Sequence, residues 1–332
     1  MLRVTWSKAM DRFLQSAAWG ISMAERVVYL NGNFVPESQA SVSVFDRSFM
    51  SGDGIYDVAR TFGHRANKLL VHCRRFAQSA RYTRIPLGHT AEEMEAICLQ
   101  LFEHNRALLA GDDDYMFWMI ASRGIDPPSR NPLEASKATV VAFNMPINYA
   151  RFAKFYKQGA HLITASTRRT PADCLDPRAK ITNKMNHVMA EFEAKSVDPE
   201  AIALMLGTDG LVAEASFANV FFVRDGRLFT PRSKNILLGI MRENVIETAP
   251  KANVEIVEGD FAPYDLYLAD EIFISTTSFS ILPISRLNGR AVGEGVPGPV
   301  TSRLIGAWNR TVSLDVVDQA LSHLTPAQRQ GL

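Results

Sequence analysis

Lys180 is the residue of this chain best suited to covalent chemistry. It lies in the segment 176–187, between a turn that Pro177 marks and an apolar stretch that favours a helix. A lysine amine forms a Schiff base with a carbonyl group once apolar surroundings keep it deprotonated. Most lysines are instead solvated surface residues, and Lys184 and Lys195 belong to the same stretch. Local sequence therefore leaves the choice among these three lysines open.

Glu214 is a second candidate for chemistry. It follows a predicted hairpin and opens the run Glu-Ala-Ser-Phe-Ala-Asn-Val-Phe-Phe, which contains Asn219. A carboxylate beside a pyridine nitrogen keeps that ring protonated and able to accept electrons from a carbanion. Taken alone, Glu214 also fits an ordinary position at the edge of a strand.

A predicted helix start supplies a candidate phosphate site. Gly239 leads into Ile240 and Met241, and free backbone N–H groups and the helix dipole at such a place attract an anion. Thr276 and Thr277 end an apolar strand and can add hydroxyls, although the same residues also cap strand ends. A lysine, a carboxylate and a phosphate site indicate a cofactor held by its carbonyl, its ring nitrogen and its phosphate.

The bulk properties of the chain exclude several other classes of protein. Its 332 residues are too many for one ordinary core and suit two domains. A net charge of +1 with scattered basic residues predicts no attraction to nucleic acid or to an anionic membrane. No apolar stretch approaches the ~20 residues of a membrane span. The seven histidines form no pair at metal-ligand spacing, so we expect no metal site.

The cysteines and the first residues of the chain indicate where in the cell the protein is located. Cys73, Cys98 and Cys174 are widely spaced, which indicates reduced thiols in the cytoplasm. Residues 1–26 are expected to form an N-terminal extension. Its apolar residues recur at helical spacing within 6–17, but polar residues interrupt them, which is unlike a signal peptide. This segment is either an extension without a packing role or a helix that packs or contacts a second copy.

Residues 27–145 read as a small α+β domain. An Asn31-Gly32 turn between 27–30 and 34–35 predicts a hairpin. Helices are expected at 72–83 and at 90–109, the second with Thr90 as N-cap and Glu93 completing a capping box. The further strands expected are 42–45, 55–61, 68–71, 115–122 and 139–144.

Residues 146–158 are expected to connect this domain to a second, larger one at 159–332. Turns at Asp209-Gly210 and Asp225-Gly226 predict two hairpins, over 201–213 and 219–230. Helices are expected at 183–195 and 240–249. The remaining strands expected are 161–165, 271–275 and 281–284. Many hairpins with few helices predict an α+β, β-rich domain and not a doubly wound parallel sheet.

In combination, the motifs resemble those of the class IV aminotransferases, which are the fold-type IV pyridoxal phosphate enzymes. Lys180, 214–219, 237–242 and 275–277 match this family in order and spacing. The resemblance extends from about residue 29 to residue 308. In the first domain, 46–58 looks like the family's substrate-side strand and 72–76 like its helix start. The resemblance implies a two-domain α+β fold with the cofactor in the cleft between the domains.

The resemblance also implies the cofactor pyridoxal 5'-phosphate and a role for each matching residue. Lys180 would form the internal aldimine and act as acid and base in a 1,3-proton shift, and Glu214 would pair with the pyridine nitrogen. The phosphate would be held by Arg75, by the amides of Ile240 and Met241, and by Thr277. The further cofactor contacts implied are Asn219, Gly239 and Thr276. The reaction would be ping-pong transfer of an amino group from an amine or amino acid to a keto acid or ketone.

The first domain carries the candidates for substrate binding. Tyr56, Val58 and Arg60 alternate on one strand and so share a face. Arg60 would grip a substrate carboxylate or form a domain-bridging ion pair. Arg123 and Arg130 lie in a loop rich in Gly and Pro, where each would bind a carboxylate or remain solvated.

Two departures from the family patterns affect the substrate. Typical L-branched-chain enzymes have a tyrosine five residues after the lysine, where this chain has Met185. D-amino-acid enzymes carry an Arg-x-His pair, but Arg130 is followed by Asn131-Pro132. The runs 56–58, 168–177 and 295–301 look closest to (R)-selective amine transaminases. We therefore favour an (R)-amine or D-amino acid as donor, with an L-branched-chain amino acid as the alternative.

Two alternatives of another class stay open at this point. One is a lyase resembling aminodeoxychorismate lyase, which would keep the cofactor but eliminate pyruvate. The other is a binding protein without catalysis, which the intact lysine, glutamate and phosphate residues argue against. The family resemblance also implies a homodimer or a higher homo-oligomer, whose first-domain loops would complete the partner's site.

Overall fold

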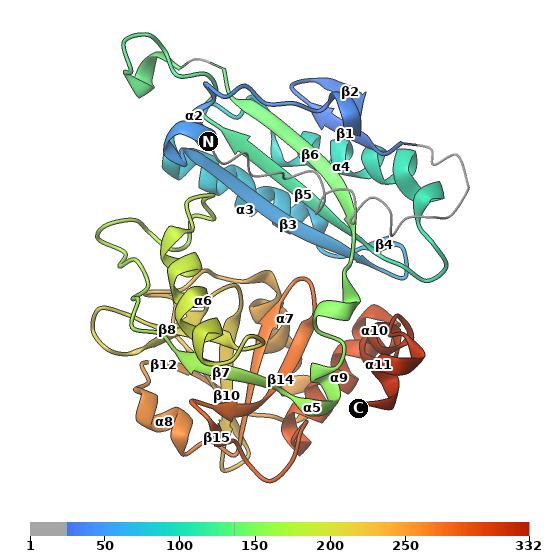
Figure 1. Cartoon of the computed structure of the whole chain (residues 1–332), viewed down its shortest axis with the longest axis vertical. Helices are drawn as coiled ribbons and strands as arrows, with labels where there is room; N and C mark the ends of the chain where they lie inside the picture. Colours follow the sequence, from blue (N-terminus) through green and yellow to red (C-terminus); the bar gives the residue numbers. More distant parts are fainter. Residues whose placement is uncertain (1–24, 136, 332) are drawn as a thin grey trace, which may run out of the picture.

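The computed structural model describes residues 25–135 and 137–331, whose strands form two sheets. The first sheet has the order β2-β1-β6-β5-β3-β4. The second has the order β12-β11-β10-β13-β14-β7-β8-β9, with β15 paired to β14. Figure 1 shows the two sheets one above the other, with the chain passing between them after β6. We call residues 25–146 the first half and residues 147–331 the second half.

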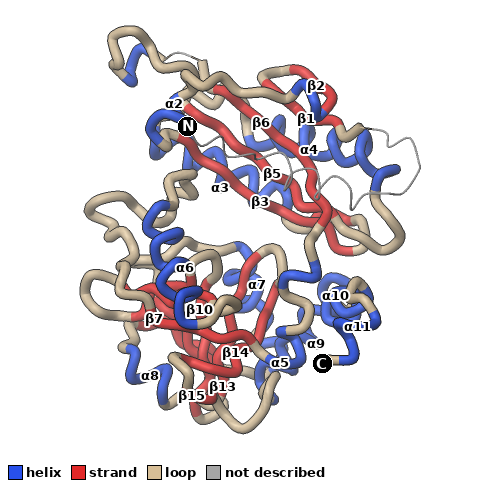
Figure 2. Tube along the Cα trace, in the orientation of Figure 1, coloured by secondary structure: helices blue, strands red, loops and turns tan. Residues whose placement is uncertain are grey.

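The first half is an antiparallel sheet covered by two helices on one face (Figure 2). Its strands are β1 (Val27–Leu30), β2 (Asn33–Pro36), β3 (Gly54–Phe62), β4 (Arg65–Ala66), β5 (Tyr115–Ser122) and β6 (Thr139–Pro146). Its helices are α2 (Arg47–Ser51), α3 (Leu69–Thr83) and α4 (Ala91–Asn105). The core forms where Phe76 of α3 and Met94 of α4 meet Ile55 of β3 and Met119 of β5. Alternate strand residues thus face the helices, as the period of two requires.

The second half is a mixed sheet with apolar clusters on both faces. Its strands are β7 (Ala160–Thr164), β8 (Ile202–Leu206), β9 (Val212–Ala215), β10 (Asn219–Arg224), β11 (Arg227–Pro231), β12 (Ile256–Gly259), β13 (Glu271–Thr276), β14 (Ser280–Leu287) and β15 (Arg290–Ala291). Its helices are α5 (Phe155–Gln158), α6 (Met185–Val197), α7 (Ile240–Thr248), α8 (Pro263–Tyr267), α9 (Pro299–Val312), α10 (Val316–Ser322) and α11 (Pro326–Gln330). β7 runs parallel to β8 and β14, β11 runs parallel to β12, and the other pairs are antiparallel. The predicted α+β class is therefore confirmed.

Several predictions about local structure are confirmed at the residue level. The Asn31-Gly32 turn joins β1 to β2. Thr90 accepts a hydrogen bond from the amide of Glu93, whose carboxylate accepts one from the Thr90 amide, which completes the capping box at α4. Gly239 is the N-cap of α7. These features depend only on neighbours in sequence, which is why a pattern predicts them.

Two predicted strands are wrong. Residues 42–45 are irregular, and the Asp46 side chain accepts a hydrogen bond from the Ser48 amide and thereby starts α2. Residues 68–71 begin α3 because Leu69 packs in the same apolar cluster as Phe76. An apolar alternation forms a strand only where a partner strand lies beside it. The helix predicted within residues 1–22 lies outside the described residues.

The predicted connector 146–158 is packed, not free. It contains a short 3₁₀ helix (Tyr149–Arg151) and α5, and its Phe152 and Tyr156 are buried in the main apolar cluster of the second sheet. No helix of the described residues is long and apolar enough to cross a bilayer.

Arg60 of β3 ties the first half to the second. Its Nη1 donates to the Ser278 carbonyl at 2.6 Å, and its Nη2 lies 3.6 Å from the Asp114 carboxylate. The guanidinium also lies 4.0 Å from the centre of the Phe62 ring. Arg60 is 3% exposed and Asp114 is fully buried. A buried charge of this kind is tolerated only with its partner in place.

Arg60→Met is expected to lower the free energy of unfolding by about 3 kcal/mol, because a buried carboxylate would lose its cation. Urea unfolding followed by circular dichroism measures this, with Arg65→Met on exposed β4 as the matched control. An unchanged unfolding midpoint with a raised KM would mean instead that Arg60 binds substrate.

Candidate active site

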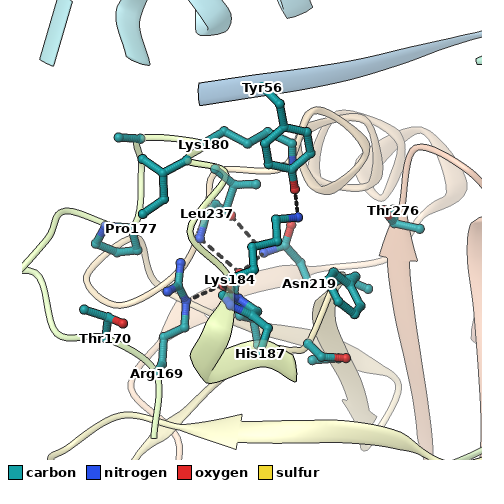
Figure 3. Close-up of a pocket in the computed structure, with 18 of the residues that line it drawn as sticks. Tyr56, Arg169, Thr170, Pro177, Lys180, Lys184, His187, Asn219, Leu237 and Thr276 are labelled. Atoms are coloured by element: carbon teal, nitrogen blue, oxygen red, sulfur yellow. Dashed lines mark hydrogen bonds and ion pairs between the residues drawn. The ribbon is translucent and has the colours of Figure 1, made fainter. Parts of the chain in front are cut away.

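One cavity of about 270 Å³ collects most of the predicted site residues. It is lined by Tyr56 and Arg75 of the first half and by segments of the second half, and Figure 3 shows it in close-up. The predicted residues that line it are Tyr56, Arg75, Lys180, Glu214, Asn219, Gly239, Ile240, Met241, Thr276 and Thr277. Residues far apart in sequence thus meet in one place.

The backbone around Lys180 is held by the first sheet. The Tyr56 amide donates to the Lys180 carbonyl, and the Thr182 amide donates to the Gly54 carbonyl, both at 2.9 Å. Ile181 forms an antiparallel bridge with Ile55, so residues 180–182 pair with the start of β3 like a short strand. This pairing attaches a segment of the second half to the first half at the predicted nucleophile.

The side chain of Lys180 is prepared for nucleophilic chemistry. Its Nζ lies 4.5 Å from the centre of the Tyr56 ring. Burial lowers the pKa of Lys180 to about 8, and the positive charges of Arg75 and Arg169 act in the same direction. A neutral amine is therefore accessible near neutral pH, which a Schiff base requires.

Glu214, in β9, is a buried carboxylate with three donors around it. Arg169 Nε donates to Oε1 at 2.6 Å, and Oε2 accepts from the Leu237 amide at 3.0 Å and from Asn219 Nδ2 at 3.4 Å. Burial raises the pKa of Glu214 although Arg169 opposes the shift. The carboxylate is thus fixed in place while remaining able to share a proton with a ring nitrogen.

Arg169 and His187 were not identified as site residues from the sequence, apart from the place of Arg169 in a run that resembles the family. Arg169 lies in the loop after β7 and His187 in the first turn of α6, with its Nε2 4.0 Å from Glu214 Oε1. Burial, with help from nearby cations, lowers the pKa of His187 to about 3, so its ring is neutral. Only the fold brings these two residues to Glu214.

The start of α7 presents backbone amides to the cavity. Gly239 caps the helix without a side-chain hydrogen bond, and the first amides of a helix lack intrahelical partners. A Cβ at residue 239 would lie 2.2 Å from Asn219 Oδ1, so any other residue there would displace the Asn219 side chain. Across the cavity, the buried Ser275 Oγ finds no hydrogen-bond partner among the described residues, beside the lining residues Thr276 and Thr277.

Arg75 of α3 is oriented by Asp57. Arg75 Nε and Nη2 donate to the two Asp57 carboxylate oxygens, each at 2.8 Å, and Nη1 donates to the Leu238 carbonyl at 2.9 Å. Burial alone would raise the pKa of Asp57, but Arg75 and His72 hold it well below its usual range. Two of the five guanidinium N–H groups remain for a ligand. Asp57 belongs to the predicted first-domain motif, yet its role was not foreseen because it lies on the opposite face of β3 from Tyr56.

Four predicted substrate residues do not line the cavity. Val58 lies opposite Trp118 in β5, and Arg60 makes the bridging contacts already described. Arg123 donates to Asp53 and to two backbone carbonyls of the α3 end. Arg130 is exposed in the loop after β5. Within one chain, no predicted arginine other than Arg75 reaches the cavity.

The two alternative lysines, Lys184 and Lys195, differ in their position relative to the cavity. Lys195 lies outside the cavity, where it donates to the Ala201 carbonyl and pairs with Glu191. Lys184 lines the cavity and donates to the Tyr56 hydroxyl.

Among the described residues, no cluster of three or more His, Cys, Asp or Glu side chains could hold a metal ion.

Most of the chain is similar to known aminotransferases. The family model for amino-transferase class IV matches residues 54–287. A Methanocaldococcus jannaschii protein, provisionally named a branched-chain-amino-acid aminotransferase, is 33% identical over 278 residues, which cover 83% of this chain and 93% of that protein. A D-alanine aminotransferase of Staphylococcus haemolyticus is 30% identical over 86% of this chain and 97% of its own.

Solved structures give the same result for the fold. The branched-chain aminotransferase of Thermoproteus uzoniensis with norvaline superposes with a TM-score of 0.79 at 28% identity, covering 91% of this chain and 99% of that one. The branched-chain amino acid aminotransferase of Thermobaculum terrenum in its PLP-form superposes with a TM-score of 0.76 at 25% identity, covering 87% of this chain and 94% of that one.

The lowered pKa of Lys180 predicts how this residue reacts with small acylating reagents. Modification of Lys180 by acetic anhydride should rise with pH to a midpoint near 8, because only the neutral amine reacts. Exposed lysines should lag behind, since their ordinary pKa is about 10.4. Mass spectrometry of pulse-labelled protein measures both in one sample, and no inflection below pH 9 would contradict the prediction.

Proposed function

This chain belongs to the class IV aminotransferases, and we propose that it transfers an amino group between an amino acid or amine and a 2-oxo acid with pyridoxal 5'-phosphate as cofactor. The observation that carries the proposal is the single cavity into which Lys180, Glu214, Arg75 and the start of α7 all face. These groups suit three parts of that cofactor, which are its aldehyde, its pyridine nitrogen and its phosphate.

The residues around the cavity fit the cofactor part by part. Lys180 offers an amine for the aldehyde, and Glu214 offers a fixed carboxylate for the pyridine nitrogen. The amides at the start of α7, the unpartnered Ser275 Oγ and the free N–H groups of Arg75 offer donors for the phosphate. The missing Cβ of Gly239 leaves room for Asn219 Oδ1 beside this helix start.

When bound, the cofactor supplies an electron sink for a carbanion at the substrate carbon. Lys180 would hold the cofactor by its aldehyde and, as a free amine, would move the proton at the substrate carbon. A pKa near 8 suits both tasks, because the same amine must give and take a proton near neutral pH. Glu214, which Arg169 keeps in position, would hold a proton at the ring nitrogen. Arg75, which Asp57 orients, would donate to the phosphate.

For the donor, we favour a D-amino acid or an (R)-amine. Met185 stands where the L-branched-chain pattern has a tyrosine, and its side chain is 66% exposed and outside the cavity lining. Relatives named D-alanine aminotransferase match 83% or more of this chain. The alternative, an L-branched-chain amino acid, is supported by relatives and structures that carry that name.

A donor panel tests the reaction and the donor together. D-alanine, L-leucine, L-glutamate and both enantiomers of 1-phenylethylamine are each offered with one 2-oxo acid, and the new amino acid is quantified. We expect D-alanine or the (R)-amine to give the highest kcat/KM, and Lys180→Ala to lose the visible absorbance and at least about 10³-fold in kcat. Faster L-leucine would establish the alternative, and pyruvate release without amino transfer would indicate a lyase. A colourless wild type would refute the cofactor.

We further propose that two copies associate through α2 and α6. Large apolar side chains are exposed on both: Phe45, Phe49 and Met50 around α2, and Met185, Met189 and Phe192 on α6. The loop before α6 contacts the end of α2, where Thr182 Oγ1 donates to the Gly52 carbonyl at 3.3 Å. Exposed apolar patches of this kind mark protein interfaces.

The three free cysteines fit a reducing compartment, and we propose that the protein is located in the cytoplasm.

Phe192→Asp is expected to convert a dimer into a monomer, because a carboxylate would be buried without a partner in the interface. Light scattering after size-exclusion chromatography measures the mass. Tyr264→Asp on α8, whose side chain is similarly exposed at 69%, is the matched control and should remain dimeric. A dimer that survives Phe192→Asp and Phe49→Asp would place the interface elsewhere.

A further inference from the structure

The cavity contains a cation for which the described part of the chain provides no carboxylate partner. Arg75 pairs with Asp57, Arg169 pairs with Glu214, and Asp176 at the rim pairs with Arg178. Lys180 is committed to the cofactor under the proposed function. The remaining cation that lines the cavity is Lys184, for which the described residues provide no ion pair. Its charge therefore remains available to a ligand.

Lys184 is held by aromatic side chains instead. It is the residue before the first turn of α6, and its Nζ donates to the Tyr56 hydroxyl. Nζ also lies 3.9 Å from the centre of the Tyr56 ring and 5.0 Å from that of Phe217. Figure 3 shows the Lys184 side chain extending toward Tyr56 within the cavity. Aromatic faces compensate a half-buried ammonium only in part, so an anion there would be favoured.

Tyr56 adds a second donor at the same point. Because Lys184 donates to the phenol oxygen, the Tyr56 hydroxyl hydrogen stays free to donate to another group. The ammonium has two further N–H groups of its own. Together they present N–H and O–H donors from adjacent atoms, an arrangement that suits the two oxygens of a carboxylate.

This pair of donors lies next to the reacting centre. Lys180 Nζ and Lys184 Nζ are 4.5 and 3.9 Å from the centre of one ring, that of Tyr56. The two amines are therefore no further apart than the sum of these distances. In an amino acid the carboxylate is bonded to the carbon that carries the amino group. A substrate whose amine replaces Lys180 would thus carry its carboxylate in the part of the cavity that Lys184 and Tyr56 line.

We propose that Lys184, together with the Tyr56 hydroxyl, binds the carboxylate of the amino acid and of the 2-oxo acid. The inference rests on the proposed function and deepens it, because it selects substrates that carry a carboxylate over plain amines. It assigns to Lys184 the role that the sequence suggested for Arg60, Arg123 or Arg130. Phe217 and Tyr56 keep the ammonium in place while the carboxylate site is empty.

The kinetic test uses two donors that differ only in the carboxylate. Alanine, in its active enantiomer, and propan-2-amine share a skeleton in which a methyl group replaces the carboxylate. Lys184→Met should lower the ratio of kcat/KM for alanine to that for propan-2-amine by about 10- to 100-fold, the range of one charge-assisted hydrogen bond. Lys184→Arg should restore part of the ratio. Lys195→Met, the same change at the far end of α6, should leave it unaltered.

A binding measurement removes any dependence on turnover. Calorimetric titration of 2-methylpropanoate, which has a carboxylate but no amine, into Lys180→Ala protein should give a Kd at least about 10-fold weaker when Lys184→Met is added. Lys195→Met in the same background should leave the Kd unchanged. This binding measurement does not require amino transfer. It therefore tests the role of Lys184 even if the proposed amino transfer is not observed. If propan-2-amine is not a donor, this measurement decides.

Three results would overturn the role of Lys184. One is an equal loss for alanine and propan-2-amine, which would indicate a role in positioning the site and not in carboxylate binding. Another is an unchanged ratio together with an unchanged Kd, which would leave the carboxylate to a group from a second copy. The last is a loss with Lys184→Arg as large as the loss with Lys184→Met, because arginine keeps the positive charge and should retain part of the carboxylate binding. Circular dichroism of each variant shows that it is folded, and Lys184→Gln replaces Lys184→Met if the latter is not.

Discussion

The pairing of residues 180–182 with the start of β3 is the interaction on which the site depends. Two backbone hydrogen bonds at 2.9 Å and the Ile55–Ile181 bridge attach a loop of the second half to the first sheet. The same strand carries Tyr56, so the aromatic ring lies over the amine that the pairing brings to it. A strand edge offers unpaired donors and acceptors, which makes it a strong and directional attachment for a segment from elsewhere in the chain. The position of Lys180 therefore follows from β-pairing and not from the helix that comes after it.

Buried charge pairs hold the surroundings of this amine in place. Asp57 orients Arg75, Arg169 orients Glu214, and Asp114 receives Arg60 at the contact between the halves. Each removal of a carboxylate from water is costly, and a partner with good geometry offsets that cost. Such pairs have few alternative arrangements, so they position functional groups more accurately than apolar contacts do. They also determine reactivity, because the cations near Lys180 add to the effect of burial on its pKa.

The cavity is divided between the two halves of the chain. Elements of the second half supply the carboxylate, the helix start and the hydroxyls that suit a phosphorylated ring, whereas β3 and α3 supply Tyr56 and Arg75. Lys184 belongs to the second half but contacts Tyr56 of the first, so the proposed carboxylate site lies where the halves meet. The groups that suit the cofactor come mainly from the second half, with Arg75 from the first, and the contact between Lys184 and Tyr56 depends on both halves.

The sequence by itself determined the elements and residues that depend on near neighbours. It was sufficient for the two-residue turns, the capping box at Thr90, the start of α7 at Gly239, and Lys180 and Glu214 as reactive candidates. It failed at 42–45 and 68–71, because an apolar alternation does not reveal whether a partner strand is present. Only the tertiary structure decided that Asp57 holds Arg75, that Arg169 faces Glu214, that Arg60 bridges the halves, and that Lys184 lines the cavity with no carboxylate partner among residues 25–135 and 137–331. The physical reason is that a charge acquires its role from what lies within a few ångströms of it, and in this chain such partners are separated by as many as 259 positions in sequence, as Arg60 and Gln319 are.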